Sequence, residues 1–232
     1  MGNPNAEFDL MSENLDELVK KGLGIFAVYR DSILSYKLDY IKHIVNKIPS
    51  SILDYGCGSG LYTSYMKNYF QSAKIYGCDV SNKSIEVAKA NHPDCEFITI
   101  SEVNDLNVYK DKIDCIFINC VMHHIEPEEH SKWLTGLYNT MKSGSYLIIF
   151  EMNMLNPLVR WFVKRTPIDD NATMLKALYC KKLIKSIFGE DGEIKLRYTY
   201  LFPWRNKFFT KIEYLFSRLP LGAQYYVAVK KK

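Results

Sequence analysis

The sequence lacks the features that mark membrane-spanning, metal-binding and disulfide-linked proteins. No apolar run approaches the roughly 18 residues that a membrane-spanning helix needs. The acidic start, MGNPNAEFDL, has no secretory signal. None of the six cysteines forms a C-x-x-C pair, and no Cys/His cluster has the spacing of a zinc site. We therefore expect a cytoplasmic protein with free thiols, no metal and no stable membrane insertion.

Internal repeats, heptad arrays and linker-like tracts of Gly, Ser and Pro are also missing. Hydrophobic residues make up 47% of the 232 residues and aromatic residues 14%, which suffices for a sizeable core. Length and composition therefore favour a single domain. Within it we expect an N-terminal helical cover over residues 1–50 and a core over 51–232, of which 153–232 elaborates one side of the binding site.

Charge is unevenly distributed along the chain. Residues 153–232 contain 16 Lys and Arg against 6 Asp and Glu, whereas residues 1–152 contain 14 against 20, so the net charge of +4 combines a basic and an acidic part. The basic part is typical of solvated helix faces, of an anionic substrate or of an anionic surface. Because these residues are not interleaved with a nucleic-acid-binding module, we expect no nucleic acid as partner.

Apolar runs alternate with amphipathic stretches between residues 51 and 153, which indicates a parallel sheet with crossover helices. Near-continuous apolar runs are typical of strands covered on both faces. The expected strands are 51–55, 74–80, 95–100, 113–121 and 146–152, and the clearest helix is 127–141. After residue 153 we expect helices over 171–188 and 205–219 and strands over 193–202 and 224–229. This order predicts a Rossmann-like, mostly parallel α/β sheet that ends in an antiparallel edge hairpin.

A glycine turn follows the first expected strand. Gly56, Gly58 and Gly60 stand at alternate positions before a helix, where glycines let a ligand approach the backbone and the helix N-terminus. Asp79 ends the next strand, and an acid there can bind both hydroxyls of a ribose. Asp54, two residues before the turn, suits an amino group better than a pyrophosphate. Together these residues predict an adenosine-containing ligand and favour S-adenosylmethionine over NAD.

Residues 51–153 resemble the core of class I S-adenosylmethionine-dependent methyltransferases, because the segment after the first strand matches their D-x-G-x-G-x-G loop. The resemblance implies a seven-stranded sheet with an antiparallel last strand, and S-adenosylhomocysteine as product. It also implies an acid that binds the ribose and residues after the second and third strands that contact the adenine. Residues at the end of the fourth strand would line the methionine part of the cofactor. The implied cofactor-binding residues are Asp54, Gly56, Cys57, Gly58, Gly60, Asp79, Val80, Ser101 or Glu102, Asn119 and Val121.

Three titratable residues follow or end the fourth and fifth strands: His123, His124 and Glu151. Ligands of open α/β sheets bind outside the carboxyl ends of the strands. A hydroxyl acceptor must lose its proton on methylation, and a histidine with a pKa near the working pH can accept it. We expect one of these residues to be the base. The alternative is structural, with a histidine that caps a helix and a glutamate that holds a neighbouring loop.

Four residues are candidates for contact with the acceptor. Tyr29 lies in the helical prefix, which could cover the mouth of the sheet, and Asn153 follows the fifth strand. Arg160 and Arg205 have guanidinium groups that suit phosphate and carboxylate. These residues predict a small, polar, anionic acceptor.

The last third is also similar, over residues 151–158, 202–203 and 219–225, to bacterial methyltransferases associated with surface-polysaccharide gene clusters. This resemblance implies O-methylation of a sugar, nucleotide-linked or phosphoramidate intermediate in capsule biosynthesis. The aromatic-rich tail instead suits a lipophilic acceptor such as a quinone or lipid, and the helix over 205–219 could lie on a membrane surface. A non-catalytic cofactor-binding activator subunit and an NAD-dependent oxidoreductase are further alternatives. The sequence does not indicate the oligomeric state.

Overall fold

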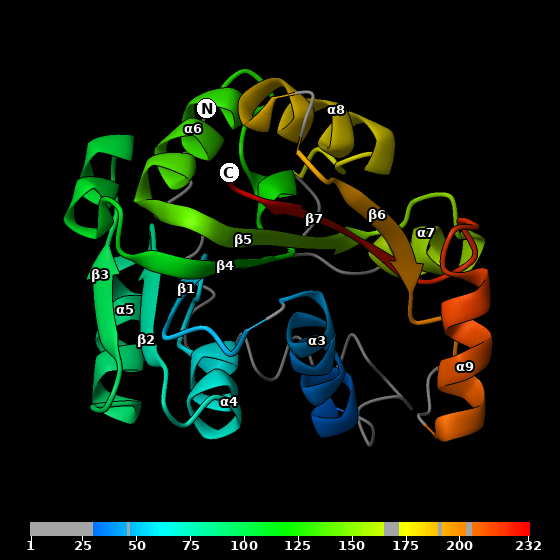
Figure 1. The fold of residues 1–232 in the computed structure, drawn as a ribbon, viewed down its shortest axis with the longest axis horizontal. Coiled ribbons are helices and arrows are strands. Elements are labelled where there is room, and N and C mark those ends of the chain that lie inside the picture. The colour runs from blue at the N-terminus through cyan, green and yellow to red at the C-terminus, as the bar shows by residue number, and fades with distance from the viewer. Residues whose placement is uncertain (1–29, 46, 165–171, 190–191, 203–205) are drawn as a thin grey trace.

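A sheet with helices on both faces forms the body of the protein (Figure 1). The computed structural model describes residues 30–45, 47–164, 172–189, 192–202 and 206–232. In chain order the elements are α3 (Arg30–Ile44), β1 (Ser51–Tyr55), α4 (Leu61–Tyr69), β2 (Lys74–Asp79), α5 (Asn82–Asn91), β3 (Glu96–Thr99), η2 (Val103–Tyr109), β4 (Ile113–Asn119), η3 (Met122–His124), α6 (His130–Thr140), β5 (Met141–Met152), α7 (Pro157–Val163), α8 (Ala177–Phe188), β6 (Lys195–Thr199), α9 (Lys207–Phe216) and β7 (Gln224–Lys230).

The seven strands lie in the order β3-β2-β1-β4-β5-β7-β6. Strands β1 to β5 pair in parallel, and β7 runs antiparallel to both β5 and β6. This confirms the predicted fold class, a mostly parallel sheet with an antiparallel last strand. The last strand in the chain is not the edge strand, because β7 inserts between β5 and β6.

The strand order reverses between β1 and β4. From β1 the chain proceeds outward to β2 and β3, and it then returns to β4 and continues outward on the other side. In open α/β sheets the crevice at such a switch point, beside the carboxyl ends of the strands, is where ligands bind. The polar residues that end β1, β2, β4 and β5 therefore meet at one edge of the sheet.

Each face of the sheet buries its own hydrophobic core. Ile52 packs with residues of α3 and α4 such as Leu38 and Met66, whereas the adjacent Leu53 packs on the opposite face with Leu134 of α6 and Ile184 of α8. Both faces of β1 are thus covered, which explains why its sequence is a continuous apolar run rather than an alternating one.

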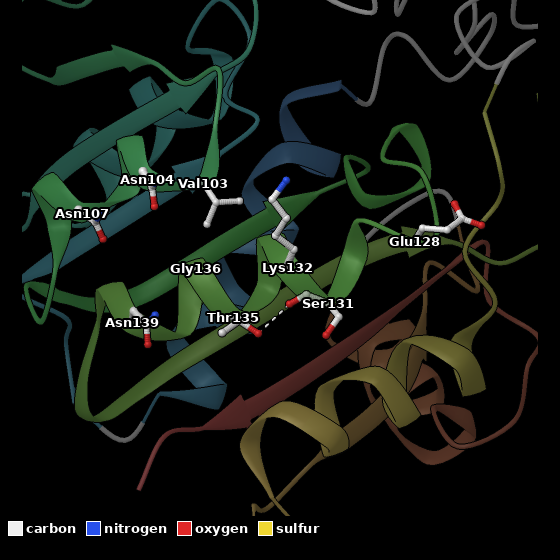
Figure 2. A pocket seen from close by; sticks show the side chains of 9 residues that line it. All are labelled: Val103, Asn104, Asn107, Glu128, Ser131, Lys132, Thr135, Gly136 and Asn139. Carbon is white, nitrogen blue, oxygen red and sulfur yellow. Dashed lines mark hydrogen bonds between the residues drawn. The ribbon is translucent and has the colours of Figure 1, made fainter. Parts of the chain in front are cut away.

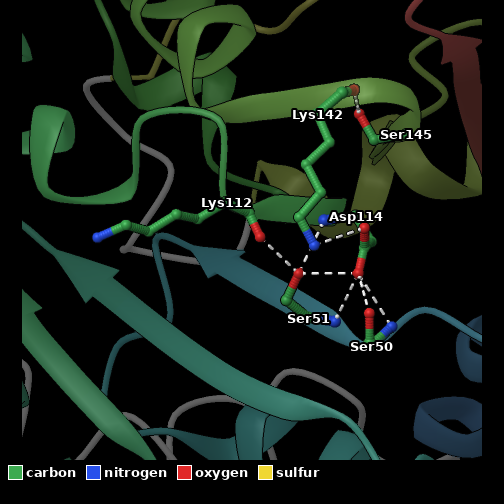
Figure 3. Close-up of polar contacts among 6 residues, drawn as sticks. All are labelled: Ser50, Ser51, Lys112, Asp114, Lys142 and Ser145. Carbon is green, nitrogen blue, oxygen red and sulfur yellow. Dashed lines mark hydrogen bonds and ion pairs between the residues drawn. The ribbon is translucent and has the colours of Figure 1, made fainter.

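Hydrogen bonds at the amino ends of the central strands join β1, β4 and β5 (Figure 3). Oδ2 of Asp114 accepts from the backbone amides of Ser50 and Ser51 at 3.1 and 3.0 Å, and Oδ1 accepts from Nζ of Lys142 at 2.9 Å. Burial acts to raise the pKa of Asp114, but hydrogen bonds from Ser50, Lys142 and Ser51 outweigh it, so the pKa lies below its usual value. This cluster lies at the strand edge opposite the switch-point crevice and stabilises the fold there.

Several element boundaries differ from the sequence-based expectation. The helix expected over 127–141 begins at His130 and ends at Thr140, because Met141 already pairs with Ile113 as the first residue of β5. Gly144, expected just beyond the end of that helix, lies within β5 at a φ of 78°. The helix expected over 171–188 begins at Ala177, and the strand expected over 193–202 is limited to β6.

Candidate active site

The glycine turn lies between β1 and α4, at the carboxyl end of β1. Gly56, Gly58 and Gly60 have φ angles of 72°, 52° and 87°, a region that glycine adopts without steric cost. The amides of Gly56 and Cys57 donate hydrogen bonds to the carbonyl of Cys78 at 2.8 and 3.0 Å. These bonds hold the turn against the end of β2.

Asp79, which ends β2, also anchors the glycine turn. Its Oδ2 accepts a hydrogen bond from the amide of Gly58 at 2.8 Å, and its Oδ1 accepts one from the amide of Ser81 at 2.9 Å. A carboxylate at this position can also accept hydrogen bonds from the hydroxyls of a ribose. The structure thus brings together the two features from which the sequence predicts an adenosine-containing ligand.

Asp54 lies in β1, two residues before the turn, and its side chain is only 2% exposed. Oδ2 of Asp54 accepts a hydrogen bond from the hydroxyl of Thr63 at 2.7 Å. The pKa of Asp54 is raised to about 7, chiefly by burial and also by the nearby charge of Asp79, against the lowering effect of the hydrogen bond from Thr63. Near neutral pH this carboxyl group can therefore carry either a proton or a charge that attracts an amino group.

The side chain of Cys57 points away from any ligand in the turn. It is buried in a small cluster with Ile85, Ala88 and Phe97, where burial raises the pKa of the thiol well above its usual value. Only the backbone of this residue could face a cofactor. The residues of the turn therefore fit a ligand that binds against main-chain atoms.

The residues predicted to contact adenine lie after β2 and β3. Val80 is half-buried against the core on the α6 side of the sheet. Ser101 and Glu102 are exposed, and their amides donate to Oδ2 of Asp105 at 2.7 and 3.0 Å. Asp105 thus fixes the segment after β3, but the structure does not favour one of the two exposed residues over the other.

A groove runs between η2 and α6 (Figure 2). Gly136 lets these two helices approach closely, because a methyl group there would lie 2.4 Å from Cγ1 of Val103. The groove contains none of the residues that the sequence predicts for the site. Its lining consists of Val103, Asn104, Asn107, Glu128, Ser131, Lys132, Thr135, Gly136 and Asn139.

The end of β4 contacts the glycine turn. A methyl group on Gly56 would lie 2.4 Å from Cγ2 of Val121, so the two segments pack without space between them. Cys120, between Asn119 and Val121, has a φ of 55°. A non-glycine residue in this conformation is uncommon, and such residues cluster at functional sites.

Lys37 of α3 reaches the same edge of the sheet and was not among the predicted site residues. Its side chain is 2% exposed, and Nζ donates a hydrogen bond to Oδ1 of Asn119 at the end of β4. Three aromatic rings surround the ammonium group, with centroids 5.5 Å away for Tyr62, 5.4 Å for Phe150 and 5.7 Å for Tyr200. Burial lowers the pKa of Lys37.

The sequence did contain a signal for Lys37. The residue lies within the apolar stripe of α3, between Leu34 and Ile41, both of which are buried. A lysine on the buried stripe of a helix is rare and needs a partner or a function. Only the fold shows that this stripe faces the ends of β4 and β5.

The structure brings His123 and Glu151 into direct contact. Nδ1 of His123 lies 2.6 Å from Oε2 of Glu151, and Oε1 of Glu151 accepts a hydrogen bond from the amide of Met122 at 2.9 Å. The ring of His123 also lies against that of His124, with 4.1 Å between centroids. His123 and Glu151 are buried and His124 is half-buried, so His124 is the most accessible of the three predicted catalytic candidates.

The structure describes two of the four predicted acceptor-side residues. Asn153 is buried, and its Nδ2 donates to the carbonyls of Pro220 and Gly222 at 3.0 and 2.8 Å, which ties the end of β5 to the loop before β7. Arg160 is exposed on α7. Tyr29 and Arg205 lie outside the described residues.

Among the described residues, no group of three or more His, Cys, Asp or Glu side chains could hold a metal ion. No helix within the same part of the chain is long and apolar enough to cross a membrane.

Residues 52–144 match the model of a protein family described as a methyltransferase domain. Malonyl-[acyl-carrier protein] O-methyltransferase of Hahella chejuensis is 30% identical over 101 residues, which cover 43% of this chain and 36% of that protein. Carboxy-S-adenosyl-L-methionine synthase 1 of Yersinia pseudotuberculosis is 22% identical over 221 residues, which cover 88% of this chain and 86% of that protein. The chain thus spans about a third of the first relative and most of the second.

The fold agrees with these matches. The plantazolicin methyltransferase BpumL, whose crystal structure contains S-adenosylhomocysteine, has a TM-score of 0.65 to this chain at 18% identity, with 98% of each chain covered. The glycine turn and the acid that ends β2 lie together at the switch point of the sheet, where an adenosine-containing ligand could bind. Residues 52–144 thus match a methyltransferase domain within a fold shared with solved methyltransferases, and the site fits S-adenosylmethionine as cofactor.

Proposed function

We propose that the protein transfers a methyl group from S-adenosylmethionine to an oxygen atom of a small, polar, anionic acceptor. The observation that carries this proposal is the hydrogen bond of 2.8 Å between the Gly58 amide and Asp79, which joins the glycine turn to the acid that would bind a ribose. Asn119 ends β4, and Glu151 is the penultimate residue of the neighbouring β5 at the same edge. A cofactor held by the turn would thus have polar side chains beside its methionine end.

The cofactor, when bound, supplies an electrophilic methyl group on a sulfonium. In our proposal the Asp79 carboxylate holds the ribose hydroxyls, and Asp54 attracts the amino group, directly or through water. The protein's main task is alignment, because a sulfonium is already a good leaving group and a well-oriented pair of reactants needs little further help. The remaining residues proposed to line this side are Gly56, Cys57, Gly58, Gly60, Val80, Ser101 or Glu102, Asn119 and Val121.

His124 is our proposed base. A hydroxyl acceptor gives up its proton as its oxygen forms a bond to the methyl carbon, and a half-buried imidazole beside the end of β4 can take that proton. His123 and Glu151 would then position His124, because their contact of 2.6 Å holds the turn that contains His124 in place. Charge balances in this step, because the sulfur leaves as a neutral thioether while the imidazole becomes positively charged with the proton that it takes up.

The anionic nature of the acceptor is supported by charge. Residues 153–232 contain 16 Lys and Arg against 6 Asp and Glu, and Arg160 on α7 is exposed. With the similarity of this region to methyltransferases of surface-polysaccharide clusters, we propose a sugar, nucleotide-linked or phosphoramidate intermediate of capsule biosynthesis as acceptor. Tyr29, Asn153, Arg160 and Arg205 remain the proposed acceptor-side residues.

A second candidate is the synthesis of carboxy-S-adenosyl-L-methionine. The Yersinia protein of that name aligns with 88% of this chain, whereas the O-methyltransferase of Hahella aligns with 43%. The two functions differ in product. Mass spectrometry after incubation of S-adenosylmethionine with an acceptor would find S-adenosylhomocysteine in the first case. In the second case carboxy-S-adenosyl-L-methionine would form only when a donor of the carboxyl group is also added.

Calorimetric titration with S-adenosylhomocysteine tests the cofactor site. We expect the wild type to bind it and Asp79→Ala to lose affinity by about tenfold or more, because hydrogen bonds to a charged group contribute about 1.5–3 kcal/mol. Asp94→Ala is a matched control, since Asp94 is exposed. Equal affinities for the wild type and both variants would contradict the assignment.

A screen of acceptors tests the reaction. We expect S-adenosylhomocysteine to form with phosphorylated sugars or nucleotide sugars, and not with quinones or lipid vesicles. Methyl transfer to the lipophilic set alone would establish the lipophilic alternative instead. Binding of the cofactor without turnover of any acceptor, unless a partner protein is added, would favour a non-catalytic activator subunit.

A further inference from the structure

We propose that Lys37 binds an anionic group of the acceptor, a carboxylate or a phosphate, at the ends of β4 and β5. The proposal rests on the methyl transfer proposed above and assigns the recognition of charge in that reaction to α3. It adds Lys37 to the acceptor-side residues proposed above.

The first argument is the lack of a counterion. Lys37 is 2% exposed, and its one hydrogen bond goes to Oδ1 of Asn119, which is a neutral amide. Within the part of the chain that the structure describes, no carboxylate forms an ion pair with this ammonium group. Asn119 and the π faces of Tyr62, Phe150 and Tyr200 supply only partial negative charge.

Burial of a charge without a counterion destabilises the folded protein, and proteins keep such a charge where it has a function. Burial lowers the pKa of Lys37, while the more distant Cys120 and Glu151 raise it. An anion bound beside Nζ would remove this penalty, because opposite charges attract strongly where water is excluded. The site thus favours an anionic ligand over a neutral one of the same shape.

The second argument is position. Lys37 contacts residues of β4, of β5 and of the segment after β6, whereas the glycine turn follows β1. In the sheet β1 is the neighbour of β4 on the side away from β5. Figure 1 shows α3 beside α4 beneath this part of the sheet, with α9 beyond it. Lys37 therefore lies on the side where an acceptor would meet the methionine end of the cofactor.

The third argument is strain in the residues that form the site. Of the three non-glycine residues with positive φ in the described chain, two belong to it: Cys120 at 55° follows Asn119, and Tyr200 at 60° provides one of the three rings. Residues held in this conformation each cost of order 1–3 kcal/mol and persist where the surrounding structure holds them for a function.

Buried contacts hold Tyr200 in place. Its ring packs edge-on against Tyr36 at 4.9 Å between centroids. Glu213 of α9 accepts hydrogen bonds from the residues on both sides, the hydroxyl of Thr199 and the amide of Leu201, each at 2.9 Å. Oε1 of Glu213 also accepts from the hydroxyl of Tyr40 in α3, at 3.0 Å. The Glu213 carboxylate thus links the segment around Tyr200 to α3, the helix that contains Lys37.

The test measures anion binding to the protein saturated with S-adenosylhomocysteine. Inorganic phosphate and acetate serve as probes at constant ionic strength, with chloride as reference, and the thermal midpoint reports their binding through mass action. We expect both probes to raise the midpoint of the wild type. In Lys37→Met the apparent Kd for phosphate should rise by about tenfold or more. Lys37→Arg, which keeps the charge, should retain the response.

Lys42→Met is the matched control, because Lys42 lies on the same helix with its Nζ over the Tyr69 ring but is exposed. It should respond as the wild type does. Lys37→Met should fold, since an apolar side chain suits a cage of aromatic rings, and it should be at least as stable as the wild type without ligand. Lys37→Gln provides a second neutral variant. Equal responses of the wild type and both neutral variants would overturn the proposal.

The cofactor also contains a carboxylate, and a second arm separates the two sources of the anion. If Lys37 binds the acceptor, Lys37→Met should change the affinity for S-adenosylhomocysteine by less than about twofold. A loss of that affinity, with unchanged affinity for 5′-methylthioadenosine, which lacks the amino-acid carboxylate, would assign Lys37 to the cofactor and overturn the proposal. Failure of the wild type to bind S-adenosylhomocysteine would contradict the proposed function itself.

Discussion

Nδ1 of His123 lies 2.6 Å from Oε2 of Glu151, and both side chains are 1% exposed. The other oxygen of Glu151 accepts a hydrogen bond from the Met122 amide at 2.9 Å. One carboxylate at the end of β5 therefore fixes the turn after β4. A pair so deeply buried stabilises a loop beside the reaction site rather than offering a group to solvent.

Removal of Glu151 should destabilise the protein strongly. Glu151→Ala leaves a buried imidazole and a buried amide without their partner, and loss of one member of a buried pair costs about 3–5 kcal/mol. Urea denaturation would measure this loss. As control, Glu129→Ala removes an ion pair of 2.6 Å with Lys132 in which both side chains are largely exposed, and it should cost less than about 1 kcal/mol. Equal costs for the two variants would contradict a structural role for Glu151.

Asp54→Asn should stabilise the protein at high pH and weaken cofactor binding. Burial raises the pKa of Asp54 from 3.8 to about 7. The stability that this carboxyl contributes is thus complete below pH 3.8 and is lost as the pH rises toward about 7. Asn cannot ionise, so the variant should gain up to about 4 kcal/mol above pH 7 and little at pH 4. Thermal melts across this range would measure the gain, and a pH-independent difference would contradict it.

Asp114→Asn should have the opposite pH dependence. Hydrogen bonds from Ser50, Lys142 and Ser51 outweigh burial and hold the pKa of Asp114 below 3.8. The stability from the charged form is therefore present above pH 3.8 and is lost as the pH falls through the lower folded value. We expect the variant to lose about 1.5–3 kcal/mol at pH 7 and progressively less in acid. Cofactor affinity should not change, because the cluster lies at the opposite edge of the sheet.

Gly56→Ala should disrupt the contact between the glycine turn and the end of β4. The added methyl group would lie 2.4 Å from Cγ2 of Val121, at a φ of 72° that costs L residues about 1–2 kcal/mol. Val121→Ala removes the clash but not the backbone strain. A double-mutant cycle on stability should therefore show partial rescue, and strictly additive effects would contradict the contact.

Much of the cofactor side could be predicted from local sequence. A turn of alternating glycines after an apolar strand, with an acid at the end of the next strand, predicts a local structure. That structure depends on few contacts with residues far away in the sequence. Gly56, Gly58, Gly60 and Asp79 accordingly lie together as expected. The sequence predicts the start of α6 three residues too early, because Pro127 and its acidic neighbours suit a helix start. In the structure residues 127–129 form a turn ahead of His130.

The chain sequence alone thus determines the strands, the glycine turn and the class of cofactor, because each depends on residues close together along the chain. The packing of α3 and α9 decides what surrounds Lys37, on the side where we propose that the acceptor binds. Lys37, Tyr62, Phe150 and Tyr200 are far apart in the sequence and meet only in the folded protein. Hydropathy indicates that a lysine on an apolar stripe is buried, but not which strand ends and rings surround it, since that depends on how whole elements pack.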